Sequence, residues 1–336
     1  MKNIVYIGNK LALKGKTATT IDTLGEGLEA AGFKINYASS YKNVFFRLVH
    51  MLWTVFRHRQ STEYVLIDTY STLNFYYAYA VSKLCQISGL KYIPILHGGN
   101  LPIRLTKNPK LSASIFKNAY VNIAPSNYIK ACFNEKGYIN VEVIPNSIDI
   151  INYPFLVREI DTINLLWVRS FSNLYNPKLA INVLSELKKK GYNCSLCMVG
   201  PDNDGSLKEV KKYANNLGLE VFFTGKLTKQ EWITLSKNYN VFINTTNFDN
   251  TPVSVIEAMA LGLPIVSTHV GGLPFLIDNT IDGQLVPPND VKAFTKAVLH
   301  YKNNPKWTQS VITSARNKAE QFDWNTVKQK WISTLK

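Results

Sequence analysis

Residues 241–272, VFINTTNFDNTPVSVIEAMALGLPIVSTHVGG, contain a strand, a loop, a helix and a second strand in succession. Residues 240–244 and 264–267 have the β-branched, apolar composition of buried strands, and 253–261 have the length of a crossover helix. This order predicts a parallel β-α-β unit with its loop at the carboxyl end of the first strand. Ligands of open α/β sheets bind at that edge.

The same alternation of strands and helices runs through the chain. Further strands are predicted at 3–7, 33–38, 64–68, 92–96, 120–124, 141–144, 163–168, 194–199 and 220–224. Helices are predicted at about 17–31, 43–58, 72–88, 126–136, 177–190, 206–217 and 228–237. We therefore predict an α/β chain of two doubly wound, Rossmann-like domains that face each other across a cleft. Their predicted extents are 1–150 and 151–322, and a last helix in 323–336 returns to the first domain.

Charge is distributed unevenly along the 336 residues. The chain has 38 Lys and Arg against 23 Asp and Glu, a net charge of +15, and residues 31–130 hold 12 basic residues but only Glu63 and Asp68 as acids. Such a basic region suits nucleic acid, an anionic membrane surface or a phosphorylated ligand. The apolar and charged fractions, 46% and 18%, exclude a disordered chain. No apolar run approaches the ~20 residues of a membrane span, and the N-terminus does not read as a secretory signal.

Two short motifs are expected to mislead. Gly15-Lys16-Thr17 resembles the end of a phosphate-binding P-loop but lacks the glycine five residues earlier, so NTPase chemistry is disfavoured. Asp202-Asn203-Asp204-Gly205 contains the Asp-x-Asp pattern of some metal sites, and we favour a turn. No histidine pair has metal-binding spacing, so no metal is predicted.

The four cysteines are also expected to be structural. Cys194 and Cys197 have C-x-x-C spacing, but an offset of three in a strand places the two thiols on opposite faces of a sheet. We read them as core residues. Four cysteines are too few for a disulfide scaffold, which favours a reducing cytoplasm.

The loop and helix of 247–261 carry the best candidate site. Asp249 lies in the loop and Glu257 follows eight residues later on the helix. Pro252 suits the first helical turn with Thr251 as the N-cap. The free N–H groups at such a helix start can bind a diphosphate, while a carboxylate farther along binds a ribose diol.

These residues resemble a known family. EAMALGLP at 257–264, with an acid eight residues before Glu257, resembles the E-x7-E region of the GT-B-fold retaining glycosyltransferases of family 4, the glycosyl transferases group 1. Six further motifs occur in the family's order: VIPNSID at 143–149, LLWVRSF at 165–171, MVGPD at 198–202, FTGKL at 223–227, HVGGLP at 269–274 and DGQLVPP at 282–288. The resemblance is strong over 140–290 and mostly topological before that.

The resemblance implies transfer of a sugar from a UDP- or GDP-linked donor with retention of anomeric configuration and without a metal or other cofactor. By position, Glu257 would bind the ribose, Asp249 the donor sugar and Arg169 the leaving diphosphate. His97, in PILHGGN, is placed near the donor sugar. The remaining donor-binding positions are Gly15, Asn250, Thr251, Pro252, Val253 and Ser254 around the phosphates and Gly225 and Lys226 beside the nucleobase.

Three positions depart from the family pattern. Asp249 replaces the usual Glu, Tyr175 stands where a second phosphate-binding lysine is common, and Phe275 replaces an acid. Lys178 is the nearest alternative cation. As for the assigned residues, Glu257 could instead be an exposed acid favoured by the helix dipole, and Asp68 is read as a cap or turn residue.

Residues 42–59, KNVFFRLVHMLWTVFRHR, combine basic and aromatic residues more densely than the rest of the basic region 31–130. On a helix, Arg47, His50, Thr54 and Arg57 line one stripe, and apolar and aromatic residues cover the rest. This pattern fits an interfacial helix on anionic lipid, with Arg47, Trp53, Phe56 and Arg57 as docking residues. A helix packed on the sheet with its basic stripe facing water fits equally well.

The leading hypothesis is a glycosyltransferase that acts on a glycan or lipid-linked acceptor in cell-surface polysaccharide or glycolipid synthesis. We expect it in the cytoplasm, peripherally bound to the inner face of the cytoplasmic membrane, with no nucleic acid partner. A nucleotide-sugar epimerase or hydrolase on the same fold is one alternative. The other is a non-catalytic membrane- or RNA-binding module on a degenerate transferase scaffold.

Overall fold

The computed structural model describes residues 2–11 and 19–336. The chain divides into two compact units. Unit 1 comprises Met1–Asn146 and Trp324–Lys336, and unit 2 comprises Ser147–Asp323. Each unit is built around its own parallel sheet, and each is described by itself below.

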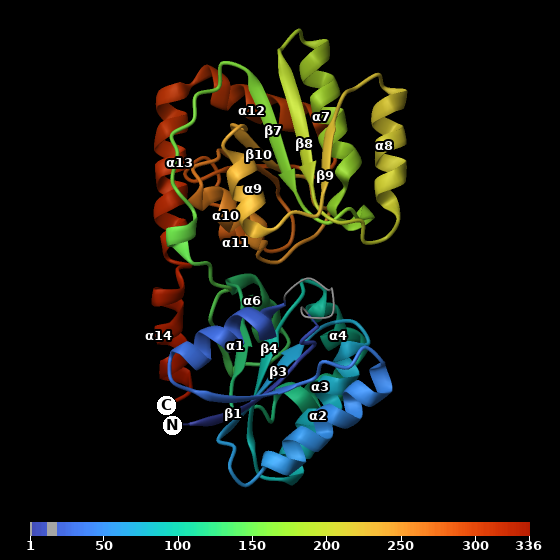
Figure 1. Ribbon diagram of the computed structural model, residues 1–336, viewed down its shortest axis with the longest axis vertical. Helices are drawn as coiled ribbons and strands as arrows, with labels where there is room; N and C mark the ends of the chain where they lie inside the picture. The colour runs from blue at the N-terminus through green and yellow to red at the C-terminus, as the bar shows by residue number, and fades with distance from the viewer. Residues whose placement is uncertain (1, 12–18) are drawn as a thin grey trace. The chain divides into compact units, whose positions relative to one another are not determined.

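Unit 1 has a six-stranded parallel sheet in the order β2-β1-β3-β4-β5-β6 (Figure 1). The chain enters at the second position of the sheet, runs to one edge, and then crosses back to build the other side. Its strands are β1 Asn3–Ile7, β2 Lys34–Ala38, β3 Tyr64–Thr69, β4 Lys91–Leu96, β5 Asn122–Ala124 and β6 Val141–Val143.

Alternation of side chains along β1 separates the two cores of unit 1. Ile4 and Tyr6 pack with α1 and α14, whereas Val5 and Ile7 pack with α2 and α3. The C-terminal helix α14 thus belongs to unit 1, where Trp331 is buried in the first of these cores. The helices of unit 1 are α1 Thr20–Ala30, α2 Val44–His58, α3 Asn74–Ile87, α4 Leu101–Lys107, α5 Pro109–Phe116, α6 Asn127–Glu135 and α14 Trp324–Thr334.

Unit 2 has a second six-stranded parallel sheet, in the order β12-β11-β10-β7-β8-β9. Its strands are β7 Ile163–Val168, β8 Cys194–Val199, β9 Phe222–Gly225, β10 Val241–Asn244, β11 Ile265–Thr268 and β12 Gln284–Val286. The two sheets confirm the predicted fold of two doubly wound, Rossmann-like units.

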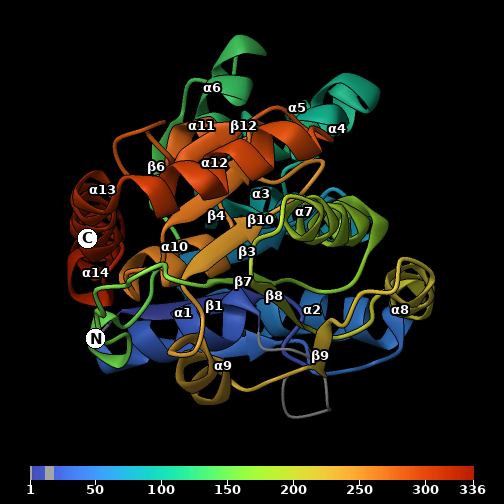
Figure 2. The same cartoon turned by 90° about the horizontal axis from the view of Figure 1, so that it is seen from above.

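Two layers of helices cover the sheet of unit 2. Helices α7 and α12 pack side by side on one face, and α10 and α13 pack on each other in the core of the other face (Figure 2). Cys194 lies in the first core and Cys197 in the second, so the predicted opposite orientation of the thiols is confirmed. The helices of unit 2 are α7 Pro177–Lys189, α8 Ser206–Asn216, α9 Lys229–Ser236, α10 Val253–Ala260, α11 Leu273–Leu276, α12 Val291–Asn303 and α13 Pro305–Glu320.

Truncation of the C-terminal helix at its anchor tests its place in unit 1. We expect Trp331→Ala to lower the free energy of unfolding by about 3–5 kcal/mol, because a buried indole is lost and a cavity remains. The measurement is urea unfolding followed by circular dichroism. Lys330→Ala, at an exposed position of the same helix, is the control and should change stability by less than about 0.5 kcal/mol. Equal stability of the two variants would contradict this role of α14.

Candidate functional site

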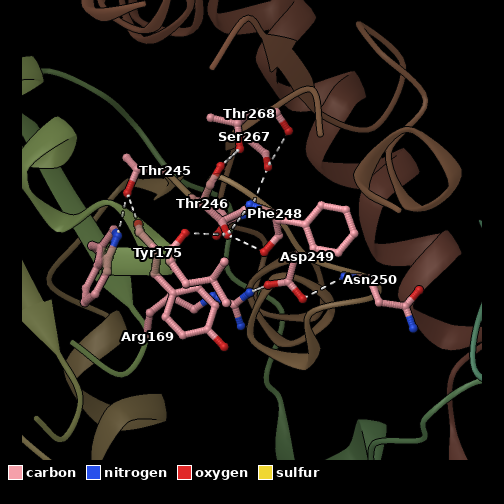
Figure 3. A network of polar contacts seen from close by, with 12 residues as sticks. Arg169, Tyr175, Thr245, Thr246, Phe248, Asp249, Asn250, Ser267 and Thr268 are labelled. Atoms are coloured by element: carbon pink, nitrogen blue, oxygen red, sulfur yellow. Dashed lines mark hydrogen bonds and ion pairs between the residues drawn. The ribbon is translucent and has the colours of Figure 1, made fainter. Parts of the chain in front are cut away.

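An ion pair joins two loops at the carboxyl edge of the sheet in unit 2. The strands β7 and β10 are neighbours in that sheet, and the loops after them carry Arg169 and Asp249. The Arg169 guanidinium contacts the Asp249 carboxylate, and both side chains are mostly buried (Figure 3). The sequence-predicted cation and the first predicted acid are therefore brought together.

The surroundings of Arg169 fix its backbone and its charge. Its N–H donates to Val199 O at 3.0 Å, and a Cβ at Gly200 would lie only 1.8 Å from Arg169 O, so a side chain there is excluded. The centre of the Tyr175 ring lies 4.5 Å from the guanidinium carbon of Arg169. Burial lowers the pKa of Arg169 to about 10, so the group remains cationic at neutral pH. Its Nε is buried without a hydrogen-bond partner among the described residues.

Hydroxyl side chains hold the loop that follows β10. Trp167 Nε1 donates to Thr245 Oγ1 at 2.9 Å, and that hydroxyl donates to Tyr175 O. Thr268 Oγ1, on β11, donates to Thr246 O at 2.6 Å (Figure 3). These bonds satisfy loop carbonyls that the strand ladder cannot reach, which makes the loop a rigid support for Asp249.

Two glycines bring a second loop against Asp249. Gly272 N–H donates to Asp249 O at 2.9 Å. A Cβ at Gly271 would lie 2.2 Å from Asp249 O, and one at Gly272 would lie 2.2 Å from Asn250 O. The HVGGLP motif thus serves the site by backbone contact, because only glycine permits so close an approach.

Helix α10 starts at Val253, as the predicted range 253–261 has it, but its cap differs from the prediction. The N-cap is Pro252, so the predicted cap at Thr251 is wrong. Proline can occupy the cap because its missing N–H would lack a helical partner anyway. The N–H groups of Val253 and Ser254 lie in the first turn, ahead of the first intrahelical bonds. Ser254 Oγ is buried and has no hydrogen-bond partner in the described chain.

Glu257 lies on α10 and is only 2% exposed, which excludes an exposed surface acid. It accepts a hydrogen bond from the Tyr153 hydroxyl at 2.8 Å and pairs with the Lys229 ammonium from α9. A buried carboxylate needs such partners to remain ionised. Sequence reasoning missed Tyr153 and Lys229, because nothing in their local pattern points to α10.

The remaining predicted residues of unit 2 fall near this edge with different contacts. Gly225, at the end of β9, has φ +72° and accepts a hydrogen bond from Gly200 N at 2.9 Å, whereas Lys226 is exposed. Lys178 pairs with Glu209 on α8. Tyr175 stacks on Arg169, so the position of the common second lysine is filled by a cation–π contact.

Unit 1 places His97 in a buried polar cluster. Its Nε2 is hydrogen-bonded to Asp68 Oδ1 at 2.8 Å, and the Tyr6 hydroxyl donates to the same oxygen at 3.0 Å. Asp68 is completely buried, so its assignment as a cap or turn residue is wrong; it orients the His97 ring. The sequence signal for this contact is that Asp68 and His97 lie at the carboxyl ends of the neighbouring strands β3 and β4. Gly15 lies outside the described residues.

No group of three or more His, Cys, Asp or Glu residues suited to a metal occurs in 2–11 or 19–336. The Asp-x-Asp pattern forms a turn, as predicted. Asp202 accepts from Gly205 N at 2.9 Å, and Asp204 accepts from Asn173 N at 3.0 Å and from Ser206 N at 3.1 Å. The side-chain hydrogen bond from Ser206, together with the backbone N–H groups of Asn173 and Ser206, lowers the pKa of Asp204 to about 2.

Comparison with known proteins finds sequence similarity to glycosyltransferases over part of this chain and similarity of fold over all of it. Residues 158–318 match the family model of glycosyl transferases group 1. A glycogen synthase of Mycobacterium tuberculosis is 26% identical over 196 residues, which are 57% of this chain and 47% of that protein. A putative colanic acid biosynthesis glycosyltransferase of Salmonella typhimurium is 36% identical over 91 residues, 26% and 22% of the two chains. This chain thus spans about half or less of these curated relatives.

The crystal structure of Anabaena HepE in complex with UDP and glucose covers 100% of this chain and 99% of its own, with a TM-score of 0.80 and 17% sequence identity. That likeness shows the fold. Each unit has the doubly wound, Rossmann-like fold of a GT-B domain, which the sequence resemblance implied.

A methyl group at residue 272 tests the contact between the two loops. Gly272 has φ −85°, which alanine adopts freely, so Gly272→Ala isolates the clash with Asn250 O. We expect unit 2 to lose about 1–3 kcal/mol of stability in thermal unfolding. Ile281→Ala, at an exposed position, should lose less than about 0.5 kcal/mol. A fully stable Gly272→Ala protein would show that the close approach is dispensable.

Proposed function

The chain has the GT-B fold with a glycosyl transferases group 1 segment, and we propose that it transfers a hexosyl group from a nucleotide sugar with retention of anomeric configuration. One observation carries the proposal. Along the chain, the first turn of α10 lies between Asp249, which pairs with Arg169, and the buried carboxylate of Glu257. A nucleoside diphosphate requires this combination of acceptors for its ribose and donors for its phosphates.

The first-turn N–H groups of α10 and the Ser254 hydroxyl bind the diphosphate in this proposal. A helix N-terminus presents unsatisfied N–H groups and a partial positive charge to an anion. Asn250, Thr251 and Pro252 shape the approach to that turn. The unpartnered Ser254 Oγ supports this assignment, because buried polar atoms are normally satisfied.

Glu257 takes the ribose, because a carboxylate accepts hydrogen bonds from both hydroxyls of a diol. Tyr153 and Lys229 hold it in place. Gly225, the last residue of β9, and Lys226, which follows it, are assigned to the nucleobase. The donor in this proposal is a uridine or guanosine diphosphate sugar, and the UDP bound by Anabaena HepE supports the uridine choice.

Arg169 stabilises the charge that develops on the leaving diphosphate. Asp249 holds the guanidinium through one edge, and Nε remains as a spare buried donor. Preorganised donors in a buried site contribute more than donors in water, because they need no reorganisation as the bond breaks. Asp249 then also reaches hydroxyls of the donor sugar, and His97, oriented by Asp68, is assigned to the same sugar. We propose that this chemistry needs no metal.

The acceptor in this proposal is a glycan or a lipid-linked glycan of cell-surface polysaccharide or glycolipid synthesis. The colanic acid relative supports this choice by its name. Four free cysteines, three of them buried, suit a reducing cytoplasm. No helix in the described part of the chain is long and apolar enough to cross a membrane.

A thermal-shift screen of nucleotide sugars tests the proposal. A donor present at 100 times its dissociation constant should stabilise the protein by ~2.7 kcal/mol. The selected donor is then incubated with lipid-linked and free glycan acceptors, and the anomer of the product is determined by NMR. Release of nucleotide without transfer to any acceptor would favour a hydrolase, and a changed free sugar nucleotide would favour an epimerase.

Neutralising the ribose-binding carboxylate should weaken donor binding. Glu257→Gln keeps the shape of the side chain but loses charge-assisted hydrogen bonds, so we expect affinity for the selected donor to fall about tenfold or more. Isothermal titration calorimetry measures the effect. Glu209→Gln, an exposed acid on α8, is the matched control. Unchanged affinity of Glu257→Gln would remove the main support for the proposed site.

Replacing the guanidinium by an ammonium should slow transfer more than it weakens binding. Arg169→Lys retains the charge but loses the planar fork of donors, and we expect kcat to fall about 100-fold. Steady-state kinetics and calorimetry separate kcat from the donor Kd. Lys178→Ala removes an exposed cation that binds Glu209 and should leave kcat unchanged. An equal loss in both variants would contradict a specific role for Arg169.

A further inference from the structure

Helix α2 of unit 1 buries unusually little of itself. Only Met51, Thr54 and Val55 of its 15 residues are buried. The neighbouring helix α3 buries six of 14 residues, and α7 in unit 2 buries seven of 13. A helix of globular proteins normally buries its apolar side. Leu48 and Leu52 pack partly against the same core, and the remaining apolar side chains of α2 are exposed.

The uncovered residues form one continuous surface, which we call the aromatic face: Phe45, Phe46, Val49, Trp53 and Phe56. Phe45, Val49, Trp53 and Phe56 follow one another at spacings of four, four and three, which places them on one side of the helix. Phe45 is 69% exposed, Trp53 56% and Phe56 45%. Soluble proteins rarely expose so many large apolar side chains together unless something binds there.

The structure reverses the orientation expected from the basic stripe. Thr54 is buried and donates to His50 O, and His50 is hydrogen-bonded to Ser39 Oγ at 3.0 Å. That part of the stripe therefore faces the protein, and Arg47 is half-buried. The alternative with the whole stripe in water is wrong. Arg57 is exposed, beside the aromatic face.

Charge indicates what covers the aromatic face. Helices α2, α3, α4 and α5 contain no Asp or Glu, whereas α1, on the opposite side of the sheet of unit 1, carries Asp22, Glu26 and Glu29. Cations occur within or beside α2 at Lys42, Arg47, Arg57 and Arg59. The Arg59 guanidinium lies 3.9 Å from the centre of the Phe56 ring, so charge and aromatic surface are contiguous. The partner must be apolar inside and anionic at its surface.

We propose that the aromatic face of α2 docks on an anionic lipid bilayer, with its rings at the level of the acyl chains and its cations at the headgroups. Aromatic side chains favour this interface, and each nearby cation adds to the attraction of anionic lipid. The helix is ~22 Å long, which suits a position in the plane of the surface and is too short to cross it. No membrane-spanning helix occurs in the described residues.

The helix is already formed before docking. Asn43 Oδ1 accepts from Phe45 N at 2.9 Å and from Phe46 N at 3.2 Å, which caps the first turn beside the first two rings. Docking therefore needs no coupled folding, and its free energy is not reduced by ordering of the backbone. This inference is independent of the donor site in unit 2, because no residue of α2 is assigned to catalysis.

Vesicle cosedimentation of the full chain tests the proposal. We expect binding to vesicles of phosphatidylcholine with phosphatidylglycerol and little binding to phosphatidylcholine alone. The variant Phe45→Ser/Trp53→Ser/Phe56→Ser should partition at least about tenfold more weakly. The variant Ile139→Ser/Ile281→Ser makes the same kind of change at exposed sites elsewhere and should bind like the unchanged protein. Absence of binding to anionic vesicles, or equal binding of all three proteins, overturns the proposal.

The cations are tested separately from the rings. Lys42→Gln/Arg57→Gln should weaken partition about fivefold for each cation at low salt, because a basic residue near the surface contributes about 1 kcal/mol. High salt should reduce binding of the unchanged protein in the same direction. Binding that ignores both salt and these substitutions contradicts an anionic partner.

Quenching by brominated lipids reports insertion directly. Tryptophan fluorescence should be quenched in anionic vesicles, and Trp53→Phe, which keeps an aromatic ring, should remove the quenching while preserving cosedimentation. Each variant is also checked for its unfolding temperature and nucleotide-sugar affinity, which should not change; failure of the donor-site proposal is thus seen separately. If the triple variant turns a dimer into a monomer and leaves vesicle binding intact, the aromatic face is a self-association surface and the proposal is wrong.

Discussion

The buried pairing of Arg169 with Asp249 is the constraint on which the site in unit 2 depends. Burying either charge without the other would cost on the order of several kcal/mol of desolvation free energy. The guanidinium and the carboxylate must therefore stay in contact. The rest of the local structure satisfies that requirement. Gly200 lets β8 approach the Arg169 backbone, and Gly271 and Gly272 let another loop approach Asp249. Hydrogen bonds from the Thr245 and Thr268 hydroxyls then hold the loop that follows β10. Motifs scattered over a hundred residues thus serve one contact.

Much of this arrangement could be predicted from sequence because parallel sheets impose simple rules. Strands recur as short β-branched runs, and their carboxyl ends collect the functional loops. Eleven predicted strands correspond to β1 through β11. Most of the missed elements are short: β12 has three residues, α11 four, and α4 and α5 seven and eight. The longer helix α12, with 13 residues, was missed as well. Helix α13 was missed although its buried residues, Thr308, Val311, Ile312, Ala315 and Ala319, recur at helical spacing.

The errors in the site have a common physical origin. Local signals report which residues favour a turn or a cap, but they do not report what another strand brings to the same place. Asp68 looked like a turn former because it follows a strand; the structure buries it under Tyr6 and His97. Glu257 acquired Tyr153 and Lys229 in the same way. The cap of α10 shifted to Pro252 because proline tolerates both positions. Partners from distant segments decide these cases, and a single sequence does not name them.

The orientation of helix α2 also depends on partners that its own sequence does not identify. Periodicity revealed two stripes but not which one the sheet would take, since either could pack. In the structure, Met51, Thr54 and Val55 are buried against unit 1, and the aromatic face of α2 is exposed. An exposed apolar patch favours aggregation, and polar residues at these positions would avoid it if the face only met water. The family match lies within unit 2, at residues 158–318. The features that would direct this chain to a surface therefore lie in the unit that the family pattern does not describe.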